Sequence, residues 1–242
     1  MYPATQRRSQ RGYSLIEVSV VVGVLGVLTF AVTSGLENIQ RFAEQRAAIA
    51  NAESARNAVR AFALNNKRLP CPAGSGAYRE APPPCTQGNG WFPYETLGMA
   101  PPPERKRMKY GVYISSVANL TAPARAASDG LDPERSGGLM VALAAAAAAP
   151  AQTSIAYYVQ STSQGSSVSC TGATSVNPAF VVIAPATDLA GNNTYFEAPH
   201  GAFGSSSNCV ASPAHRADAG MDDVVVAEST AELLGWISNA TR

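Results

Sequence analysis

An almost uncharged apolar segment near the N-terminus constrains this chain more than any other feature. From Val18 to Leu36 no residue is charged, and Val, Leu and Gly dominate. As a helix rising about 1.5 Å per residue, this segment would cover roughly 28 Å, close to the ~30 Å hydrocarbon core of a bilayer. Residues 1–12, upstream of this segment, include Arg7, Arg8 and Arg11 and no acidic residue. This asymmetry predicts a cytoplasmic N-terminus and a translocated C-terminal part.

A motif of known type precedes the apolar segment. The basic leader ends in Gly12, and the sequence Tyr13-Ser14-Leu15-Ile16-Glu17 follows it. This arrangement resembles the N-terminal processing signal of type IV pilins and type II secretion pseudopilins, with tyrosine in place of the usual phenylalanine. In that family a prepilin peptidase cuts after the glycine, and the new N-terminus is methylated. The resemblance implies a leader of residues 1–12, cleavage between Gly12 and Tyr13, and methylation of Tyr13.

A carboxylate at the start of a membrane span is costly unless it has a partner. Glu17 would be the fifth residue of the mature chain, close in height to the free amine of Tyr13 on a neighbouring subunit. Pairing the two charges removes much of the desolvation cost that each suffers alone. We therefore expect Glu17 to set the register of assembly; the alternative is a glutamate that reaches the lipid headgroups on its own.

Two other kinds of N-terminal segment fit part of this pattern. A secretory signal peptide also has a basic start and an apolar core, but the apolar run is long and Ala31-Val32-Thr33 is a poor cleavage site. A plain signal anchor is the second alternative. It would tether a periplasmic binding protein or enzyme, and it gives no reason for Glu17 or for the Gly12-Tyr13 pair.

The composition indicates one anchored globular domain. The chain has 242 residues, of which 46% are hydrophobic and only 14% charged. Removing the three leader arginines from the 18 basic residues leaves the chain close to neutral against its 17 acidic residues. No basic stripe interleaves with aromatic residues, so nothing indicates nucleic-acid binding.

Four cysteines follow the apolar segment, at Cys71, Cys85, Cys170 and Cys209. On the predicted topology they face an oxidising compartment, where an even number indicates disulfides. Three pairings are possible, and we favour Cys71–Cys85 with Cys170–Cys209 because each joins neighbours in sequence. Zinc is the alternative, but paired Cys-x-x-Cys spacing is missing.

Beyond the apolar segment the pattern indicates an α+β domain. The helix is expected to continue through Glu37–Asn66, which has no proline or glycine, and to end by Pro70. Phe42, Ile49, Val59 and Phe62 suggest an apolar stripe that a sheet must cover. Further elements are expected as strands at 110–117, 155–160, 180–184 and 224–227, paired antiparallel, and as helices at 139–149 and after the capping sequence that starts at Ser229.

No catalytic motif was found, and no cofactor is predicted. The two histidines, His200 and His215, lie in Gly/Ser/Pro-rich loops and form no ligand pattern. Asp222 and Asp223 precede a strand and are interpreted as capping residues. A weak calcium site is conceivable because oxygen ligands gather after one strand, at Asp188, Asn192, Asn193 and Glu197.

The resemblance implies a pilin fold: a long N-terminal helix, half transmembrane, packed on a small antiparallel sheet in a loop-rich, disulfide-bonded head. The corresponding division is residues 1–12, 13–36 and 37–242. We expect a non-enzymatic minor pilin of a type IV pilus, initiating or at the tip, held in the bacterial inner membrane before assembly at the cell surface. Its partners would be other pilin subunits, the prepilin peptidase and an inner-membrane assembly platform; a type II secretion pseudopilin is the alternative.

Overall fold

The computed structural model describes residues 14–122, 138–159, 168, 170, 174–189, 191–218 and 220–240; the side chains of residues 30–38 are outside this description. The chain consists of two compact units, Met1–Ala43 and Glu44–Arg242. In the first unit, the described residues form the beginning of helix α1 (Leu15–Asn66), which has 52 residues. The second unit, which we call the head, contains the rest of α1 and every strand. The predicted long N-terminal helix is therefore confirmed.

Helix α1 ends where the sequence stops favouring it. Its last turn is closed by a hydrogen bond from the Lys67 N–H to the Ala63 carbonyl, 2.9 Å. Lys67 then adopts a left-handed φ of 54°, a common way for a helix to end. Pro70 follows, and it lacks the N–H that another helical turn would require.

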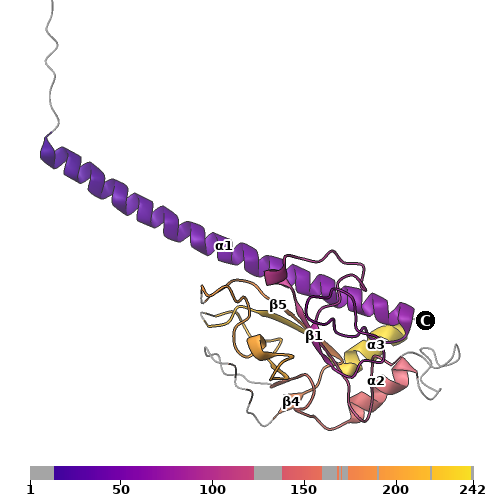
Figure 1. The fold of residues 1–242 in the computed structure, drawn as a ribbon. Helices are drawn as coiled ribbons and strands as arrows, with labels where there is room; N and C mark the ends of the chain where they lie inside the picture. The colour runs from indigo at the N-terminus through magenta and orange to yellow at the C-terminus, as the bar shows by residue number, and fades with distance from the viewer. Residues whose placement is uncertain are drawn as a thin grey trace, which may run out of the picture. The chain divides into compact units, whose positions relative to one another are not determined.

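Four strands form the main sheet of the head, in the order β1-β2-β5-β7, and every neighbouring pair is antiparallel. They are β1 (Asn89–Trp91), β2 (Lys109–Val112), β5 (Phe180–Ala184) and β7 (Val224–Glu228). The last part of α1 runs along this sheet (Figure 1). An α+β head with an N-terminal helix on an antiparallel sheet agrees with the predicted fold class.

A second, smaller sheet corrects one expectation. It has the order β4-β3-β6, with β3 (Tyr157–Val159), β4 (Ser175–Val176) and β6 (Cys209–Val210). The β3–β4 pair is antiparallel, but β3 and β6 are parallel, against the prediction of antiparallel pairing. Roughly fifty residues separate these two strands, and a long connection permits the parallel direction.

Strand β5 is buried on both faces, which explains its continuous apolar sequence. Phe180 and Val182 face the core shared with the helices, whereas Val181 and Ile183 face a second core. On this second side, the neighbouring strand β2 has Gly111, because the surrounding side chains leave no space for a larger residue. A methyl group on Gly111 would lie 2.8 Å from the Phe203 ring and 2.9 Å from Val181.

The face of α1 that packs on the sheet differs from the predicted stripe. The buried residues share small size and helical spacing, and they are Ala48, Ala52, Ala55, Val59 and Ala63. Of the predicted positions only Val59 is buried; Phe42 and Ile49 are 69% and 46% exposed. Alanines let the helix backbone approach the sheet closely. The prediction was based on large apolar residues, and of this buried face it therefore included only Val59.

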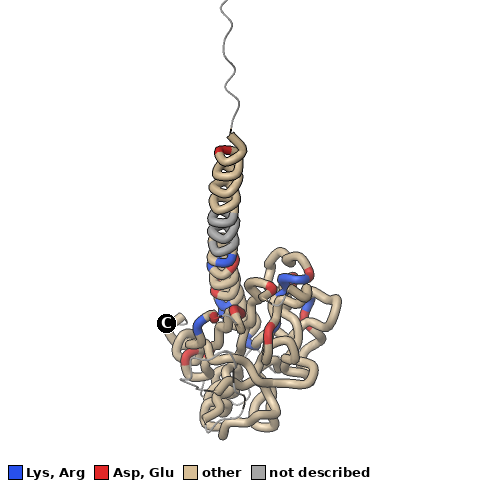
Figure 2. Tube along the Cα trace, turned by 90° about the vertical axis from the view of Figure 1, so that its left-hand side faces the viewer, with Lys and Arg blue, Asp and Glu red and all other residues tan. Residues whose placement is uncertain are grey.

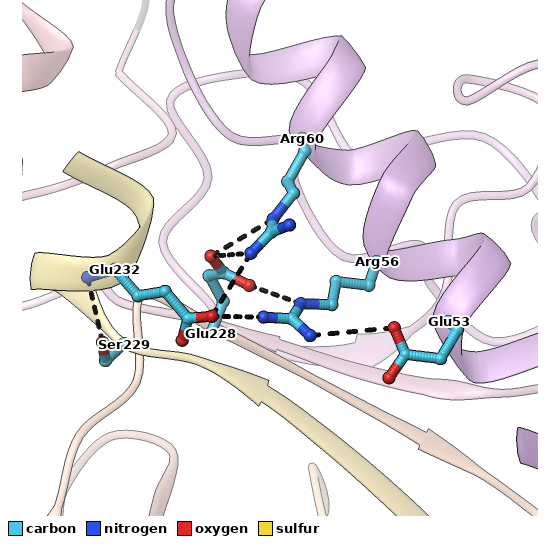
Figure 3. Close-up of polar contacts among 6 residues, drawn as sticks. All are labelled: Glu53, Arg56, Arg60, Glu228, Ser229 and Glu232. Carbon is cyan, nitrogen blue, oxygen red and sulfur yellow. Dashed lines mark hydrogen bonds and ion pairs between the residues drawn. The ribbon is translucent and has the colours of Figure 1, made fainter. Parts of the chain in front are cut away.

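Two further helices and two short 3₁₀ turns complete the head: α2 (Leu139–Ala148), α3 (Thr230–Ala240), η1 (Glu104–Lys106) and η2 (His200–Ala202). Helices α2 and α3 pack against each other. The Ser229 hydroxyl accepts the Glu232 N–H at 3.0 Å and so caps α3 as predicted. The Glu232 side chain does not return to Ser229; it turns to arginines of α1 instead (Figure 3).

Candidate functional site

The first candidate site is the start of α1. The predicted cleavage site, Gly12 and Tyr13, lies outside the described residues. Glu17 is in the first turn of the helix and is exposed, and its Oε2 accepts the Ser14 N–H at 3.3 Å. An acidic residue is favourable here because the free N–H groups give this end of a helix a partial positive charge.

Large apolar side chains flank Glu17 in the sequence and lie on all sides of the helix. Leu15 is 88% exposed and Val27 70%, and uncharged turns succeed the acidic start of α1 (Figure 2). Exposed apolar surface on this scale marks an interaction site. This part of the chain therefore has a surface without a partner among the described residues.

The structure describes only part of the predicted membrane span, Val18–Leu36, because the side chains of residues 30–36 lie outside the description. Within the described residues, no helix combines the length and the apolar character that crossing a bilayer requires.

A network of charged residues joins α1 to the end of β7 and to α3 (Figure 3). The Glu228 side chain is fully buried; it accepts Arg56 Nε and Arg60 Nη2, each at 2.6 Å. Glu232 accepts Arg56 Nη2 at 2.5 Å and Arg60 Nη2 at 3.4 Å, and Glu53 lies 3.7 Å from Arg56 Nη1. Burial opposes the charge of Arg56, but the hydrogen bond and charge of Glu228 raise its pKa. We call these five residues the arginine clamp.

The arginine clamp was not found by sequence reasoning. One signal was present: Arg56 and Arg60 are four residues apart on an alanine-rich helix, so they lie on one face of it. Glu228 and Glu232 are also four residues apart, but Glu228 ends β7 and Glu232 lies in α3. Only the packing of α1 against β7 brings the two pairs together.

Both disulfides of the favoured pairing are present in the head. Cys71 bonds to Cys85 and Cys170 to Cys209, with Cα–Cα distances of 5.8 and 5.9 Å. The first closes a loop that follows α1, and the second joins β6 to the segment before β4. The cysteines therefore stabilise loops, and they hold no metal.

The structure does not gather the four calcium candidates around one point. Asp188 accepts the N–H groups of Asn192 and Asn193 at 3.2 and 2.6 Å, closing a turn of its own loop. The Asn193 side-chain oxygen accepts Arg105 Nη1 at 3.0 Å. Glu197 lies instead with two carboxylates that precede β7.

Glu197, Asp222 and Asp223 form the second candidate site, which we call the carboxylate cluster. One carboxylate oxygen of each residue lies within 4.8 Å of one oxygen of each of the other two. Asp223 Oδ2 accepts the Glu197 N–H at 3.2 Å, and Asp222 accepts the Thr187 N–H at 3.1 Å. Asp223 Oδ1 is buried, and no hydrogen bond of the described residues reaches it.

His200 supports this cluster as a neutral donor. The Ala211 N–H donates to its Nε2 at 3.0 Å, so Nδ1 carries the proton and donates to Asp223 Oδ2 at 2.7 Å. Burial, with a smaller effect of the Lys109 charge, lowers the pKa of His200 to about 3. Since both ring nitrogens are occupied, His200 is not placed to serve as a general base.

Lys109 is the cation beside the cluster. Its Nζ donates to the carbonyls of His200, Gly201 and Phe203 at 2.6, 2.9 and 3.1 Å, which uses all three N–H groups. Burial lowers the pKa of Lys109 to about 8, and the charge of Asp223 opposes the shift. Lys109 thus holds the η2 turn in place and makes no direct hydrogen bond to the carboxylates.

Burial is also the main effect on the acids themselves. It raises the pKa of Glu197 to about 7, with further contributions from Asp223 and Asp222, while the nearby Leu189 amide opposes the shift. It raises the pKa of Asp223 to about 8, reinforced by Asp222 and opposed by the Glu197 N–H and by Lys109. The interpretation of Asp222 and Asp223 as mere capping residues therefore leaves out their burial beside a third acid.

Comparison with known proteins agrees with the N-terminal motif. Residues 7–33 match the family model of the prokaryotic N-terminal methylation motif. The chain is also 35% identical over 65 residues to "Type II secretion system core protein G" of Aeromonas hydrophila. That alignment covers 27% of this chain and 46% of the relative, so the chain matches about half of that protein's length. No solved structure matches the chain significantly. The predicted likeness to pilins and pseudopilins is confirmed.

Proposed function

We propose that this chain is a minor pilin-like structural subunit of a type IV pilus. In this proposal residues 1–12 are removed, Tyr13 is methylated, and the N-terminal part of α1 anchors the subunit in the bacterial inner membrane until assembly. The head would then be periplasmic, and afterwards part of the filament exterior. Other pilin subunits, the prepilin peptidase and an inner-membrane platform are the proposed partners.

One observation carries the proposal: α1 begins with a methylation motif and continues as an exposed apolar surface whose acidic residue is Glu17. Burying apolar surface contributes roughly 25 cal/mol per Å², so helices of this kind gain much by packing together. Glu17 would oppose that packing unless a positive charge meets it. The amine of Tyr13 on a neighbouring subunit is the proposed partner.

A type II secretion pseudopilin is the second candidate, favoured by the similarity to a secretion system core protein. A signal-anchored binding protein or enzyme is the third. Mass spectrometry of the purified protein separates the third from the other two. An N-methylated Tyr13 at the mature N-terminus is the expected result, whereas an intact leader contradicts pilin-like processing.

A second experiment tests assembly. The variant Glu17→Ala is expected to be processed but to be missing from sheared pili, because the register contact is lost. Glu53→Ala is the matched control, since it removes an acid from the same helix outside the apolar part. Equal amounts of wild type and Glu17→Ala in the filaments would refute the pairing. A role of the protein in secretion, without incorporation into pili, would favour the pseudopilin.

A further inference from the structure

We infer that a polar pocket of the head is a binding site for neutral carbohydrate. The pocket has a volume of about 370 Å³ and is lined by residues 86–89, 154–155 and 204–208 and by Ile114. Small-molecule sites commonly have volumes of roughly 300–1,000 Å³. All the lining residues belong to the head, and the inference does not depend on the proposed function. We call this site the amide pocket.

Hydrogen bonds within the head hold the walls of the amide pocket. The Gly88 carbonyl accepts the Val112 N–H at 2.7 Å, and a methyl group on Gly88 would lie 2.6 Å from the Val112 carbonyl oxygen. The turn 204–207 begins with Gly204, which has a left-handed φ of 81°, and its N–H donates to the Ser207 carbonyl at 3.0 Å. The pocket is therefore already formed, and a ligand does not have to order these segments.

The chemistry of the lining is polar and neutral. Among the described residues that line the amide pocket, none is charged. Hydroxyl and carboxamide groups, which both donate and accept hydrogen bonds, stand exposed at its rim on Thr86, Gln87, Ser205 and Ser206. A phosphate or a carboxylate is bound best by Arg or Lys, whereas a sugar hydroxyl also both donates and accepts. The lining thus matches a neutral ligand with many hydroxyl groups.

Two apolar side chains lie among the polar groups. Ile114 and Ile155 line the amide pocket, and both are partly buried against the main core of the head. A sugar ring carries hydroxyl groups at its edge and C–H groups on its faces. A pocket that combines hydrogen-bonding groups with apolar surface can cover both parts of such a ring.

An acceptor without a donor lies in the wall of the pocket. Asn208 Nδ2 donates to the Thr153 carbonyl at 3.2 Å, so Asn208 Oδ1 faces Asn89 and accepts its Nδ2 at 2.7 Å. This orientation leaves Asn89 Oδ1 buried, with no donor among the described residues. A buried acceptor without a donor is unfavourable, and a hydroxyl group of a ligand can supply that donor.

A second hollow extends the amide pocket. It has a volume of about 260 Å³ and shares Thr86, Gln87 and Asn89 with the pocket. Its other described lining residues are also uncharged, and they include Pro72, Pro82 and Pro84. Two adjoining hollows suit an oligosaccharide of a few units, since each hollow can take a separate ring.

The backbone beside the two hollows argues against a peptide as the ligand. A peptide commonly binds by adding a strand to the free edge of a sheet. At the outer edge of β1, Trp91 is already paired with Ala73: the Ala73 N–H donates to the Trp91 carbonyl at 2.8 Å, and the Trp91 N–H donates to the Ala73 carbonyl at 3.0 Å. Recognition here therefore depends on side chains, as it does for sugars.

Calorimetric titration of the full-length protein, in a detergent without a sugar headgroup, tests the inference. The trisaccharide of N-acetylglucosamine represents the acetylated sugars of bacterial wall glycan, maltotriose represents plain hexoses, and sialyllactose is the anionic comparison. At least one neutral trisaccharide is expected to bind with a Kd of about 1 mM or lower. Raising sodium chloride from about 0.05 to 0.5 M should change this Kd by less than about twofold. No binding of either neutral sugar at about 10 mM, or tighter and salt-sensitive binding of sialyllactose, would overturn the inference.

Two variants locate the binding. Ser206→Trp places a large side chain in the pocket and should weaken binding at least about tenfold. Ser116→Trp is the matched control, because Ser116 is exposed outside the pocket, and it should leave the Kd unchanged. Gln87→Ala removes an exposed hydrogen-bonding group and should weaken binding about three- to tenfold without loss of folding. Affinities of both pocket variants within about twofold of the wild type would show that the amide pocket is not the site.

Discussion

In the first unit, large apolar side chains such as Leu15 and Val27 are exposed, whereas in the head charged side chains such as Glu228 and Lys109 are buried. Each buried charge has partners within the chain: two arginines for Glu228 and three carbonyls for Lys109. The exposed apolar side chains of α1 have none there.

The difference indicates where each unit finds its stabilisation. A buried charge is tolerated when hydrogen bonds from the same chain replace water, as they do for Glu228 and Lys109 in the head. Exposed apolar surface gains free energy only when lipid or another protein covers it. The start of α1 is thus a surface for other molecules, and the following changes test this contrast.

The largest expected effect follows removal of the central acid of the arginine clamp. Glu228→Ala leaves Arg56 and Arg60 partly buried without their main partner and should lower the free energy of unfolding by about 3–5 kcal/mol. Urea denaturation of the full-length protein in detergent measures this loss. Glu232→Ala, whose side chain is half exposed, should cost about 1 kcal/mol or less. Equal losses in the two variants would contradict the importance of burial.

Loss of the disulfides should come next. The bond Cys170–Cys209 spans 39 residues and Cys71–Cys85 spans 14. In the chain-entropy model, replacing each pair by serine lowers the free energy of unfolding by about 4 and about 3 kcal/mol, respectively. Reductant should lower the melting temperature of the wild type and leave a variant without cysteines unchanged. A wild-type melting temperature that ignores reductant would refute both bonds.

Acid should weaken the ion pair of Arg68 and Glu80. In this pair Arg68 Nη2 donates to Glu80 Oε1 at 2.6 Å, and Arg68 Nη1 donates to Glu80 Oε2 at 2.7 Å. Burial opposes ionisation, but hydrogen bonds from Arg68 and the Cys71 N–H lower the pKa of Glu80 below its ordinary 4.5. The folded state therefore holds this proton less tightly than the unfolded chain, so the contribution is complete above pH 4.5 and is lost as the pH falls through the lower folded value.

The variant Glu80→Gln should lower the free energy of unfolding by about 2 kcal/mol at pH 7 and by much less near pH 3. Denaturation curves at both values check this. Glu95→Gln is the control, because its partner Arg79 is 82% exposed, and it should change stability little at either pH. A cost for Glu80→Gln that grows on acidification has the wrong sign for this explanation.

The smallest effect on folding is expected for Glu17→Ala. Because Glu17 is exposed and its described contact is the nearby Ser14 N–H, the unfolding of the head should change by less than about 0.5 kcal/mol. The loss of filament incorporation proposed above should nevertheless be nearly complete. A large loss of head stability would contradict the expectation that Glu17 acts in assembly and not in folding.

Several elements were predictable because their signals are local. Helix α1 was expected from a long stretch without proline or glycine, β5 from its continuous apolar run, and the α3 cap from Ser229. Other features depend on what packs against them. The buried face of α1, from Ala48 to Ala63, carries alanine at every position except Val59, so it became visible only against the sheet. The parallel β3–β6 pair depends on a long connection whose path is not encoded in either strand.

The sequence by itself determined the processing motif, the apolar start of α1, the cysteine content and most of the secondary structure, since each depends on residues close together in the chain. The tertiary structure alone decided which charges meet: Arg56 and Arg60 with Glu228, and Glu197 with Asp222 and Asp223. The physical reason is that buried charges require partners at hydrogen-bond distance. Chain folding supplies those partners from segments separated by tens to more than a hundred residues, beyond the range of any local pattern.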